Sequence, residues 1–517
     1  MRVDLSGLRV TVMGLGMHGG GLSAARYAVA RGATVTVTDL RDERTLRTSV
    51  ERLPEECRTV LGAHEDADFS RADLVIKNPA VPRTVRFLRL ARAVTTDIAL
   101  FLGEWIGGSD DIGALAPLVA VTGTKGKSLT SSAIAHVLSA HFPTTRLGGN
   151  ITISPLDFVD EITSQDPVVL ELSSFQLGDL AFVRGHNATT GAVPAGVPRL
   201  VCAPTLPAAA AIITNIFTDH QDYYGSMDAY VADKQEIYRH LAPNGTFITD
   251  AAGPWAKTFA ADLRERATQP YRLELVPRPS DAAGGGNVTG APSDAERADE
   301  SDCCLPARLP VPGVHNRHNL RMAATAARHL GMDPTEISAA VASFPGVPHR
   351  LETVRRLNGV RFVNDTAATI PEAAEAAVRA FVAEAGIGPV YLLAGGSDKG
   401  LDLSPLIAAV KHAVATGGGI ALLSGTATDR LIATGGMDVE APRFDDIRTA
   451  VIHLFHAAVA ARRTEAGAPA DQPALAGDDK TISPSHATEA VILLSPGCAS
   501  FGMFQNEYDR GDQFTAA

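Results

Sequence analysis

The stretch PLVAVTGTKGKSLTSSAIAHVLSA, residues 117–140, decides the fold class of this chain. An apolar run of strand length enters a loop, and a helix-like pattern begins at Ser128. The loop is a short relative of the Walker A motif, with fewer residues between its glycines. Its backbone amides can cradle phosphates, while the lysine charge and the serine hydroxyl serve the γ-phosphate and Mg²⁺. We predict an ATP site, with a chance match as the alternative, at Gly123, Thr124, Lys125, Gly126, Lys127 and Ser128.

A second glycine-rich loop lies nearer the N-terminus, between a strand-like run and a helix-like pattern. It reads GLGMHG, residues 14–19, and Asp39 follows at about the ~20-residue distance typical of a ribose-binding acid. Glycines let the backbone approach a diphosphate at a helix N-terminus. This physics fits any nucleoside diphosphate, UDP or NAD, and a purely structural tight turn is the alternative. The candidate residues are Gly14, Gly16, Met17, His18, Gly19 and Asp39.

Further strand-like and helix-like runs alternate along the rest of the chain. Strands are predicted at 168–173 and 210–216, a long helix over 227–241, and a third α/β unit from about residue 344. At roughly 150 residues per domain, 517 residues predict three domains. We predict an α/β fold with mostly parallel sheets and mobile surface insertions at 276–304 and 462–487, which are rich in Ala, Gly, Pro, Ser and Asp.

The charge balance excludes some classes of partner. Lys plus Arg number 46 against 58 Asp plus Glu, a net charge of −12, which argues against nucleic acid and anionic membranes as partners. No apolar run approaches the ~20 residues of a membrane span, and the start lacks a signal-peptide core. We therefore expect a cytoplasmic protein with no membrane insertion. The five scattered cysteines support neither disulfides nor a zinc site.

Three polar residues stand out beyond the loops. Glu171 ends an apolar strand, where open α/β sheets place their ligands, although a helix cap or the partner of a buried arginine is the alternative. His220, in TDH at 218–220, follows the next strand in the same way. Lys234 lies on the predicted helix, where a solvated helix face is the simpler interpretation.

Several motifs occur in an order that chance would rarely produce. They are GTKGKS (123–128), LELSSFQL (170–177), TDHQDYY (218–224), the Lys234 helix, GVHN (313–316), PHRLE (348–352) and NDT (364–366). In this order, over nearly the full length, the chain resembles the Mur ligases. LELSSFQL, AGGSDKGLD (394–402) and LLSPGCASFGMF (493–504) make it most similar to the MurD type, which joins glutamate to UDP-N-acetylmuramoyl-L-alanine.

The resemblance implies an architecture and a set of residue roles. It implies a Rossmann-like UDP-substrate domain at 1–97, an ATP-binding domain at 98–346 and a Rossmann-like amino-acid domain at 347–517. Lys127 would hold the γ-phosphate, Ser128 and Glu171 would bind Mg²⁺, and His220 would bind a second Mg²⁺. Lys234 would be a carbamylated, metal-orienting lysine, and Asn150 would lie near the UDP-sugar. Further ATP-binding positions are His315, Asn316, Asn319, Arg350 and Asp365, and amino-acid-binding positions are Thr369 and Ser500.

The implied reaction is ATP-dependent formation of an amide bond. The substrate carboxylate attacks the γ-phosphate to give an acyl phosphate and ADP, and the amine of glutamate then expels phosphate. An anion attacking an anion needs neutralising cations, and an acyl phosphate needs protection from water by domain closure. We expect a monomer whose only partners are its substrates, UDP-N-acetylmuramoyl-L-alanine and glutamate.

Two positions depart from the pattern of the D-glutamate-adding members. Ala367 stands where a glutamate-binding lysine is usual, and Glu507 stands where phenylalanine is usual. Losing such a lysine removes a charge-assisted contact of roughly 1.5–3 kcal/mol. Both changes fall in the amino-acid pocket, whereas the ATP and metal motifs are intact, which indicates an altered substrate and retained chemistry. One branch of the resembled family adds L-glutamate, and we lean to that branch, with D-glutamate as the alternative.

Two other classes compete with a ligase. A nicotinamide oxidoreductase would explain the first glycine loop and Asp39, but it leaves GTKGKS, LELSS and TDH unexplained. A non-catalytic nucleotide-binding partner protein is the third possibility. Titration with NAD(H) tests the oxidoreductase, which must bind this cofactor at residues 14–19. The variant Lys127→Ala tests the non-catalytic protein, because this change should abolish activity only in a ligase.

Overall fold

The computed structural model describes eleven stretches of the chain. They are residues 3–17, 19–107, 115–151, 153–163, 165–266, 269–278, 304–306, 309–384, 386–435, 441–465 and 488–517. His18 and most of the two predicted insertions lie outside the described residues. Both predicted insertions were wrong at their starts, because strand β11 (Arg272–Val276) includes residue 276 and helix α16 (Ile447–Glu465) continues through residues 462–465.

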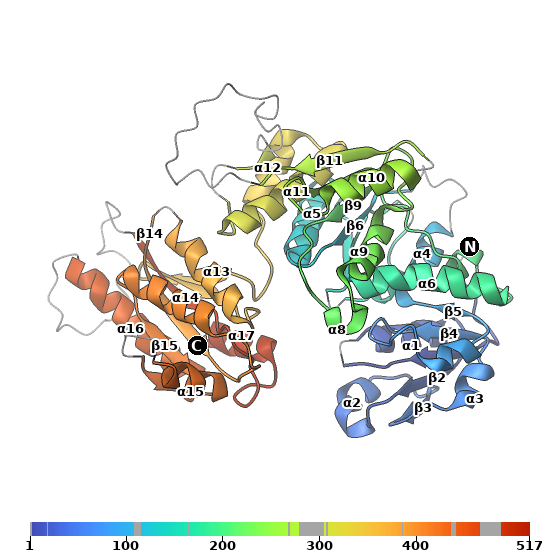
Figure 1. Ribbon diagram of the computed structural model, residues 1–517, viewed down its shortest axis with the longest axis horizontal. Coiled ribbons are helices and arrows are strands. Elements are labelled where there is room, and N and C mark those ends of the chain that lie inside the picture. Colours follow the sequence, from blue (N-terminus) through green and yellow to red (C-terminus); the bar gives the residue numbers. More distant parts are fainter. Residues whose placement is uncertain are drawn as a thin grey trace. The chain divides into compact units, whose positions relative to one another are not determined.

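The first sheet has five parallel strands in the order β3-β2-β1-β4-β5 (Figure 1). β-Branched residues dominate β1 and β2, whose inward faces are buried. Asp42 caps α2 and Thr96 caps α4 through side-chain oxygens that accept helix amides. The elements are β1 (Arg9–Met13), α1 (Gly20–Ala30), β2 (Thr34–Asp39), α2 (Glu43–Val50), β3 (Arg58–Leu61), α3 (Asp66–Ser70), β4 (Leu74–Lys77), η1 (Arg86–Leu90), β5 (Val94–Thr95) and α4 (Asp97–Ile106).

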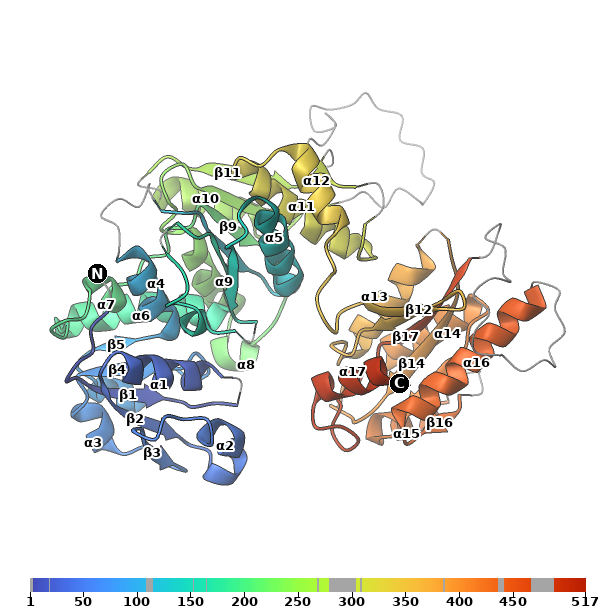
Figure 2. The same cartoon turned by 180° about the vertical axis from the view of Figure 1, so that it is seen from behind.

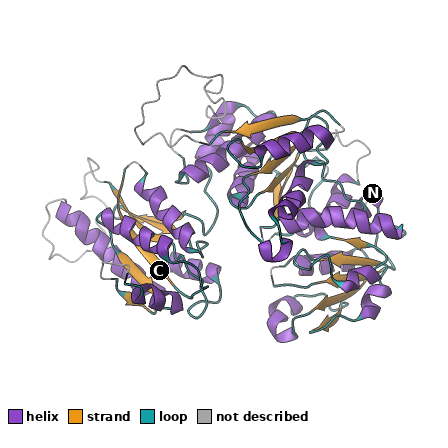
Figure 3. Cartoon of the chain, in the orientation of Figure 1, coloured by secondary structure: helices purple, strands orange, loops and turns teal. Residues whose placement is uncertain are grey.

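The second sheet has six parallel strands in the order β11-β10-β9-β6-β8-β7, flanked by helices (Figure 3). Its central strands are buried on both faces, as parallel sheets require. The elements are β6 (Leu118–Thr122), α5 (Lys127–His141), β7 (Arg146–Gly149), η3 (Pro155–Asp157), β8 (Val168–Glu171), α6 (Ser174–Thr190), α7 (Arg199–Cys202), β9 (Ala210–Ile213), α8 (Gln221–Tyr224), α9 (Met227–Gln235), η4 (Glu236–Tyr238), β10 (Thr246–Asp250), α10 (Ala256–Arg266), β11 (Arg272–Val276), α11 (Val314–His329) and α12 (Pro334–Ala342).

The predicted helix over 227–241 was too long. The α-helix ends at Gln235, and a single 3₁₀ turn over Glu236–Tyr238 follows. This tighter turn buries all three of its side chains, and the Glu236 carboxylate accepts a hydrogen bond from Arg184 on α6. Burial and ion pairing therefore end the helix earlier than its sequence pattern suggests.

The third sheet has six strands in the order β12-β13-β17-β14-β15-β16, and β12 alone runs antiparallel to its neighbour. The last strand, β17, lies in the middle, so distant segments meet there. Helices α13–α15 cover one face and α16 and α17 the other (Figure 2). The elements are β12 (Glu352–Leu357), β13 (Val360–Asn364), α13 (Pro371–Val382), β14 (Ile387–Gly395), α14 (Ser404–Ala415), β15 (Ile420–Leu423), α15 (Thr426–Ala433), β16 (Arg443–Phe444), α16, β17 (Glu489–Leu494) and α17 (Glu507–Ala516).

The described chain forms two compact units. Unit 1 comprises Met1–Arg308 and His318–Phe344, and unit 2 comprises Leu309–Arg317 and Pro345–Ala517. One hydrophobic core joins the first sheet to the second, which explains their grouping in unit 1. The α/β prediction is confirmed, whereas the three domain boundaries remain a prediction. Within the described residues, no helix combines the length and apolarity that a membrane span needs.

Candidate functional site

The loop after β6 can form only with its two glycines. Gly123 has φ 150°, and a Cβ there would lie 1.9 Å from Thr214 Oγ1. Gly126 has φ 82°, and a Cβ there would lie 2.6 Å from Asn319 Oδ1. Gly126 is also the N-cap of α5, with no side chain capping the helix amides. The loop therefore places the N-terminus of α5, which has no side-chain cap, at the carboxyl edge of the sheet, where the helix dipole favours an anion.

Residues after β9 hold this phosphate loop in place. Asn215 Oδ1 accepts from the Lys125 amide at 2.9 Å, and its Nδ2 donates to the Lys125 carbonyl at 2.9 Å. The Thr214 hydroxyl donates to the same carbonyl at 2.6 Å. Thr214 and Asn215 were not predicted from the sequence, although polar residues at the end of a buried strand were the available signal. The loop is thus preorganised by the neighbouring strand.

Lys127 folds back over its own loop. Its Nζ donates to the carbonyls of Gly123 and Thr124, at 3.1 Å each, and the side chain is half-buried. The ammonium group therefore lies over the loop, where a bound phosphate would meet it. This geometry fits the predicted role of Lys127 toward a γ-phosphate.

Glu171 is a buried carboxylate beside the phosphate loop, with a relative exposure of 1%. Oε1 accepts from Asn150 Nδ2 at 3.1 Å, and Oε2 accepts from the Ser131 hydroxyl at 3.4 Å. The same hydroxyl lies 3.3 Å from the Ser128 carbonyl, so one residue bridges Glu171 and the loop. In the described part of the chain, no ion pair to Glu171 occurs within 4 Å. Because burying an unpaired charge is costly, the site favours a bound cation.

Lys234 lies in the interior, so a solvated helix face was the wrong interpretation. Its exposure is 2%, and Nζ donates to the Gly123 carbonyl at 2.9 Å and to Thr122 Oγ1 at 3.2 Å. The ammonium also lies 4.8 Å from the centroid of the Tyr230 ring. Burial, and then the nearby charge of Lys127, hold the pKa of Lys234 well below its usual range. A lysine with such a pKa is readily neutral and therefore nucleophilic.

His220 lies at the rim of the same sheet edge. It adopts the left-handed conformation, with φ 51°, and its ring packs 5.0 Å from Phe175. Its Nε2 lies 4.0 Å from the Asp219 carboxylate, which is 4.0 Å from the Lys125 ammonium. The imidazole is exposed and remains accessible to a ligand.

The first glycine loop is supported by Asp39. Its carboxylate accepts from the Gly16 amide at 3.1 Å and from the Arg41 amide at 2.9 Å, and the residue is buried. Gly19 begins α1 without a side-chain cap, and Met17 is 56% exposed. Diphosphate binding at this loop remains a prediction, and the Asp39 carboxylate already shapes the loop itself. Its role toward a ribose remains a prediction.

Unit 2 contains the predicted residues Arg350 and Asp365. Asp365 is buried, accepts from the Ser495 hydroxyl at 2.8 Å and from the Leu351 amide at 3.1 Å, and burial raises its pKa to about 7. His349 and Leu351, on either side of Arg350, have φ of 64° and 45°. Backbone strain of this kind concentrates at functional sites.

One of the further predicted ATP-binding residues, Asn319, lies against the phosphate loop. It belongs to unit 1 and lies against Gly126. His315 and Asn316 group with unit 2, where the Asn316 amide donates to the Pro312 carbonyl at 2.6 Å.

The two predicted amino-acid-binding residues lie on neighbouring loops of unit 2. Thr369 belongs to the loop after β13 and Ser500, which is buried, to the loop after β17. The Gly497 amide donates to the Ala368 carbonyl at 2.8 Å and joins the two loops. Ala367 lies in the first of these loops.

The start of α17 meets the same region. Thr366 Oγ1 donates to the Glu507 carbonyl at 2.8 Å, and buried Arg510 donates to Thr366 and to the Cys498 carbonyl. Arg510 was not predicted, because an arginine near a polar chain end gives no sign of burial. Both departures from the family pattern, Ala367 and Glu507, therefore adjoin Thr366.

The fold and the site define a nucleotide-binding α/β enzyme with a preorganised phosphate loop beside a buried acid. Comparison with known families agrees. Residues 8–100 match the MurD-like N-terminal domain of Mur ligases, and residues 197–327 match the Mur ligase middle domain.

Two relatives match over almost the whole chain. The UDP-N-acetylmuramoylalanine–D-glutamate ligase of Roseiflexus sp. is 37% identical, covering 99% of this chain and 98% of the relative. The enzyme of the same name from Treponema pallidum is 34% identical over the same shares. The fold of Thermotoga maritima MurC is similar, with a TM-score of 0.52 at 16% identity over 98% of each chain. The chain belongs to the Mur ligase family and is an ATP-dependent, ADP-forming ligase.

Proposed function

We propose that this protein joins D-glutamate to UDP-N-acetylmuramoyl-L-alanine in the synthesis of peptidoglycan precursors. The observation that carries the proposal is the buried Glu171 carboxylate, which lies without an ion-pair partner beside the phosphate loop in the described structure. The names of the full-length relatives support the substrate pair. They favour D-glutamate, which the sequence analysis held as the alternative, over L-glutamate.

The proposed chemistry follows from the charges at the loop. A carboxylate oxygen of the UDP-substrate attacks the γ-phosphorus of ATP, the bond to the β-γ bridging oxygen breaks, and ADP leaves. The amine of glutamate then attacks the acyl carbon, expels phosphate and loses a proton. Lys127 and the α5 amides neutralise the charge that develops on the transferring phosphoryl group.

The residues at the loop fit a magnesium ion held mainly by substrate. No described cluster of three or more His, Cys, Asp or Glu side chains could hold a metal by itself. Mg²⁺ usually takes one or two protein oxygens and completes its shell with phosphates and water. Glu171 and the Ser128 hydroxyl would supply those oxygens, and His220 would serve a second ion. Bound Mg²⁺ would neutralise phosphate charge during transfer.

Lys234 fits the proposed carbamate. Its low pKa leaves a neutral amine that can add to CO₂, forming a C–N bond and releasing a proton. The product would be an anion near the charge of Lys127, which would attract it. The carbamate could also orient a metal.

The proposed substrate sites lie at the first glycine loop, at the end of β7 and in unit 2. The glycine loop at residues 14–19 would bind the UDP diphosphate, and Asn150, which holds Glu171, would lie near the sugar. Thr369 and Ser500 would bind the incoming amino acid.

L-Glutamate is the second candidate substrate. Ala367 and Glu507 both adjoin Thr366, so the pocket lacks the usual lysine and gains a carboxylate. That change of charge favours a different pose of the amino acid.

A paired assay separates the two candidates. The purified full chain would receive UDP-N-acetylmuramoyl-L-alanine, Mg²⁺-ATP and one glutamate enantiomer at a time, with phosphate release and product mass followed together. We expect turnover with D-glutamate. Turnover with L-glutamate alone overturns the proposed enantiomer, and no turnover with either overturns the proposed ligation.

A further inference from the structure

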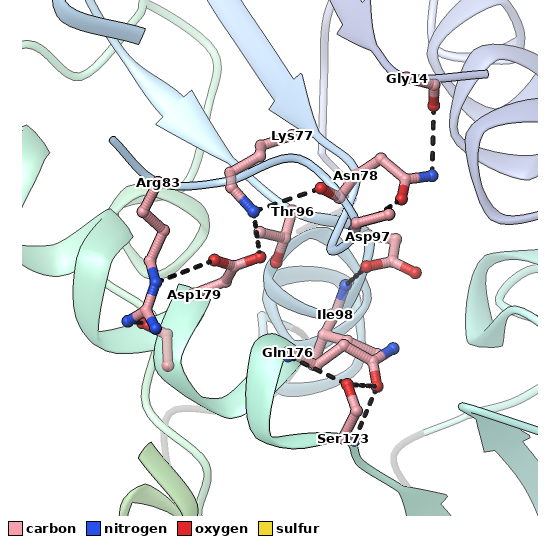
Figure 4. Close-up of polar contacts among 12 residues, drawn as sticks. Gly14, Lys77, Asn78, Arg83, Thr96, Asp97, Ile98, Ser173, Gln176 and Asp179 are labelled. Carbon is pink, nitrogen blue, oxygen red and sulfur yellow. Dashed lines mark hydrogen bonds and ion pairs between the residues drawn. The ribbon is translucent and has the colours of Figure 1, made fainter. Parts of the chain in front are cut away.

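Residues 78–83 form a short segment that connects the first glycine loop to helices α6 and α9 of unit 1. Asn78 follows β4, and its Nδ2 donates to the Gly14 carbonyl at 3.2 Å (Figure 4). Its Oδ1 accepts from the Ala80 amide at 3.0 Å. A Cβ on Gly14 would lie 2.9 Å from Asn78 Cβ, so the two backbones pack closely. Residues 78–83 therefore form one short segment, which contacts the glycine loop at Asn78 and ends at Arg83.

Arg83 crosses from this segment to helices of the second sheet. Its guanidinium forms a two-pronged contact with the Asp233 carboxylate, in which Nη1 donates to Oδ1 at 3.1 Å and Nη2 donates to Oδ2. Nη1 also donates to the Gly178 carbonyl on α6 at 3.2 Å. The Arg83 Nε lies 3.8 Å from Asp179 Oδ1 (Figure 4). The Arg83 and Asp233 side chains are only 22% and 14% exposed. A paired, partly desolvated fork of this kind fixes orientation as well as distance.

Asp233 is enclosed on its other sides. The Tyr224 hydroxyl donates to Asp233 Oδ2 at 2.9 Å, and a Cβ on Gly178 would lie 2.1 Å from the same oxygen. Helices α6 and α9 are therefore in close contact here, as both views of the ribbon show (Figures 1 and 2). The carboxylate has little room to move without moving α9.

Asp233 is followed directly by Lys234 on α9. Consecutive helix residues point about 100° apart, so one turn carries both side chains in fixed relative directions. Asp233 faces Arg83 and α6, while Lys234 Nζ reaches Thr122 and Gly123 of the phosphate loop. Rotating α9 to release Asp233 would therefore withdraw Lys234 from the loop.

We infer that Arg83 is a positioning residue: through Asp233 it sets the rotation of α9, and so places Lys234 against the phosphate loop. Through residues 78–83, Arg83 also joins α9 to the first glycine loop. This inference rests on the proposed function for its effect on catalysis, but its effect on α9 is independent of it. An ordinary structural ion pair would stabilise unit 1 as a whole, without a specific effect on α9.

The variants remove the fork in different ways. Arg83→Met and Asp233→Asn each remove one partner, and the double variant tests whether they act through each other. Arg83→Lys keeps the charge but cannot form the two-pronged contact. Gly178→Ala keeps every charge and displaces Asp233 by steric contact. Arg86→Met is the matched control, because Arg86 forms an exposed two-pronged pair with Asp66, away from α9.

Steady-state kinetics and hydrogen exchange on the full-length protein provide the two measurements. We expect kcat of ligation to fall about 10- to 100-fold in Arg83→Met, with KM for ATP changed less than about twofold. The variants Gly178→Ala and Arg83→Lys should also lower kcat. The double variant of Arg83→Met and Asp233→Asn should have a kcat no lower than that of the less active single variant. Amides of α9 should exchange faster in Arg83→Met, and neither kcat nor exchange should change in Arg86→Met.

Two results would overturn the inference. One is normal kcat and normal α9 exchange in Arg83→Met, and the other is an equal loss in Arg86→Met, which would indicate general destabilisation. If the unaltered protein fails to ligate, the proposed function fails, while exchange in α9 still decides whether Arg83 positions the helix.

Discussion

Two buried ionisable side chains lie beside the phosphate loop, and neither has an ion-pair partner within 4 Å among the described residues. Glu171 is held by an amide and a hydroxyl, and Lys234 by a carbonyl and a hydroxyl. Such neutral partners satisfy hydrogen bonds but do not compensate a charge on either group. The residues are therefore arranged for charges that arrive with the substrates.

Replacing Lys127 should abolish measurable ligation. Lys127→Met removes the ammonium that lies over Gly123 and Thr124, and losing one such donor to developing charge typically costs about 10²- to 10³-fold in kcat. Phosphate release in the presence of both substrates is the measurement. Lys257→Met, an exposed lysine on α10, should behave as the unaltered protein. Normal ligation by Lys127→Met would contradict the assignment of the loop.

The raised pKa of Asp365 predicts a pH dependence of stability. Burial raises this pKa from 3.8 to about 7, so between these values the folded chain holds a proton that the unfolded chain has released. Unit 2 should therefore lose stability as pH rises from about 4 to about 7, and change little through this group above that. Asp365→Asn should flatten the dependence.

Hydrogen exchange in β13, corrected for the intrinsic rate at each pH, measures that stability in the full chain. Asp402→Asn is the control, because hydrogen bonds from Ser404 lower the pKa of this exposed carboxyl, the opposite direction. An unchanged pH profile in Asp365→Asn would contradict the raised pKa.

At the residue scale, the sequence predicts chemistry better than environment. Lys127, Ser128 and Glu171 could be selected because a glycine loop and a strand end are local patterns. The burial of Lys234 and Arg510 could not, because each depends on helices packing against distant loops. A lysine or arginine on a polar helix resembles a solvated one until its tertiary neighbours are known.

At the scale of elements, α17 shows how one helix shapes the amino-acid pocket. Gly511 packs against the loop after β13, and a Cβ there would lie 2.5 Å from His349 Nδ1 and 2.6 Å from Thr366 Cγ2. The helix can reach Thr366 because this position has no side chain. The start of α5 was predictable to within one residue, whereas the early end of α9 coincides with the buried Glu236–Arg184 pair.

Gly511→Ala should destabilise unit 2. Alanine favours a helix by about 1 kcal/mol relative to glycine, whereas forcing a methyl into a packed contact costs about 1–3 kcal/mol. The clash should match or exceed the gain, with a net loss of up to about 2 kcal/mol and faster amide exchange in α17. Gly185→Ala in α6 is the matched control, because its Cβ meets open space and only the propensity gain applies. A stabilised Gly511→Ala would contradict this packing.

At the scale of the whole molecule, the predicted roles are divided between two units. Unit 1 contains both glycine loops, and unit 2 contains Arg350, Asp365 and the predicted amino-acid pocket. The alternation of strands and helices made the α/β fold predictable from sequence. The grouping of Leu309–Arg317 with unit 2 was not, because it depends on contacts between segments far apart in the chain.

This division predicts separable effects on binding and turnover. Arg350→Met should lower kcat/KM for ATP about 10- to 150-fold, the equivalent of a charge-assisted contact of about 1.5–3 kcal/mol. Binding of UDP-N-acetylmuramoyl-L-alanine, measured by calorimetry, should be unchanged, because the proposed site lies in unit 1. Equal losses in both quantities would contradict the division of roles.

The central claim is that the phosphate loop directs the γ-phosphoryl group of ATP to a substrate carboxylate. The most direct measurement follows ¹⁸O from the labelled L-alanyl carboxylate of the UDP-substrate during ligation of glutamate. An acyl phosphate transfers one of these oxygens to the released phosphate, so we predict one ¹⁸O in the phosphate for each amide bond formed. Unlabelled phosphate accompanying amide formation would contradict the account.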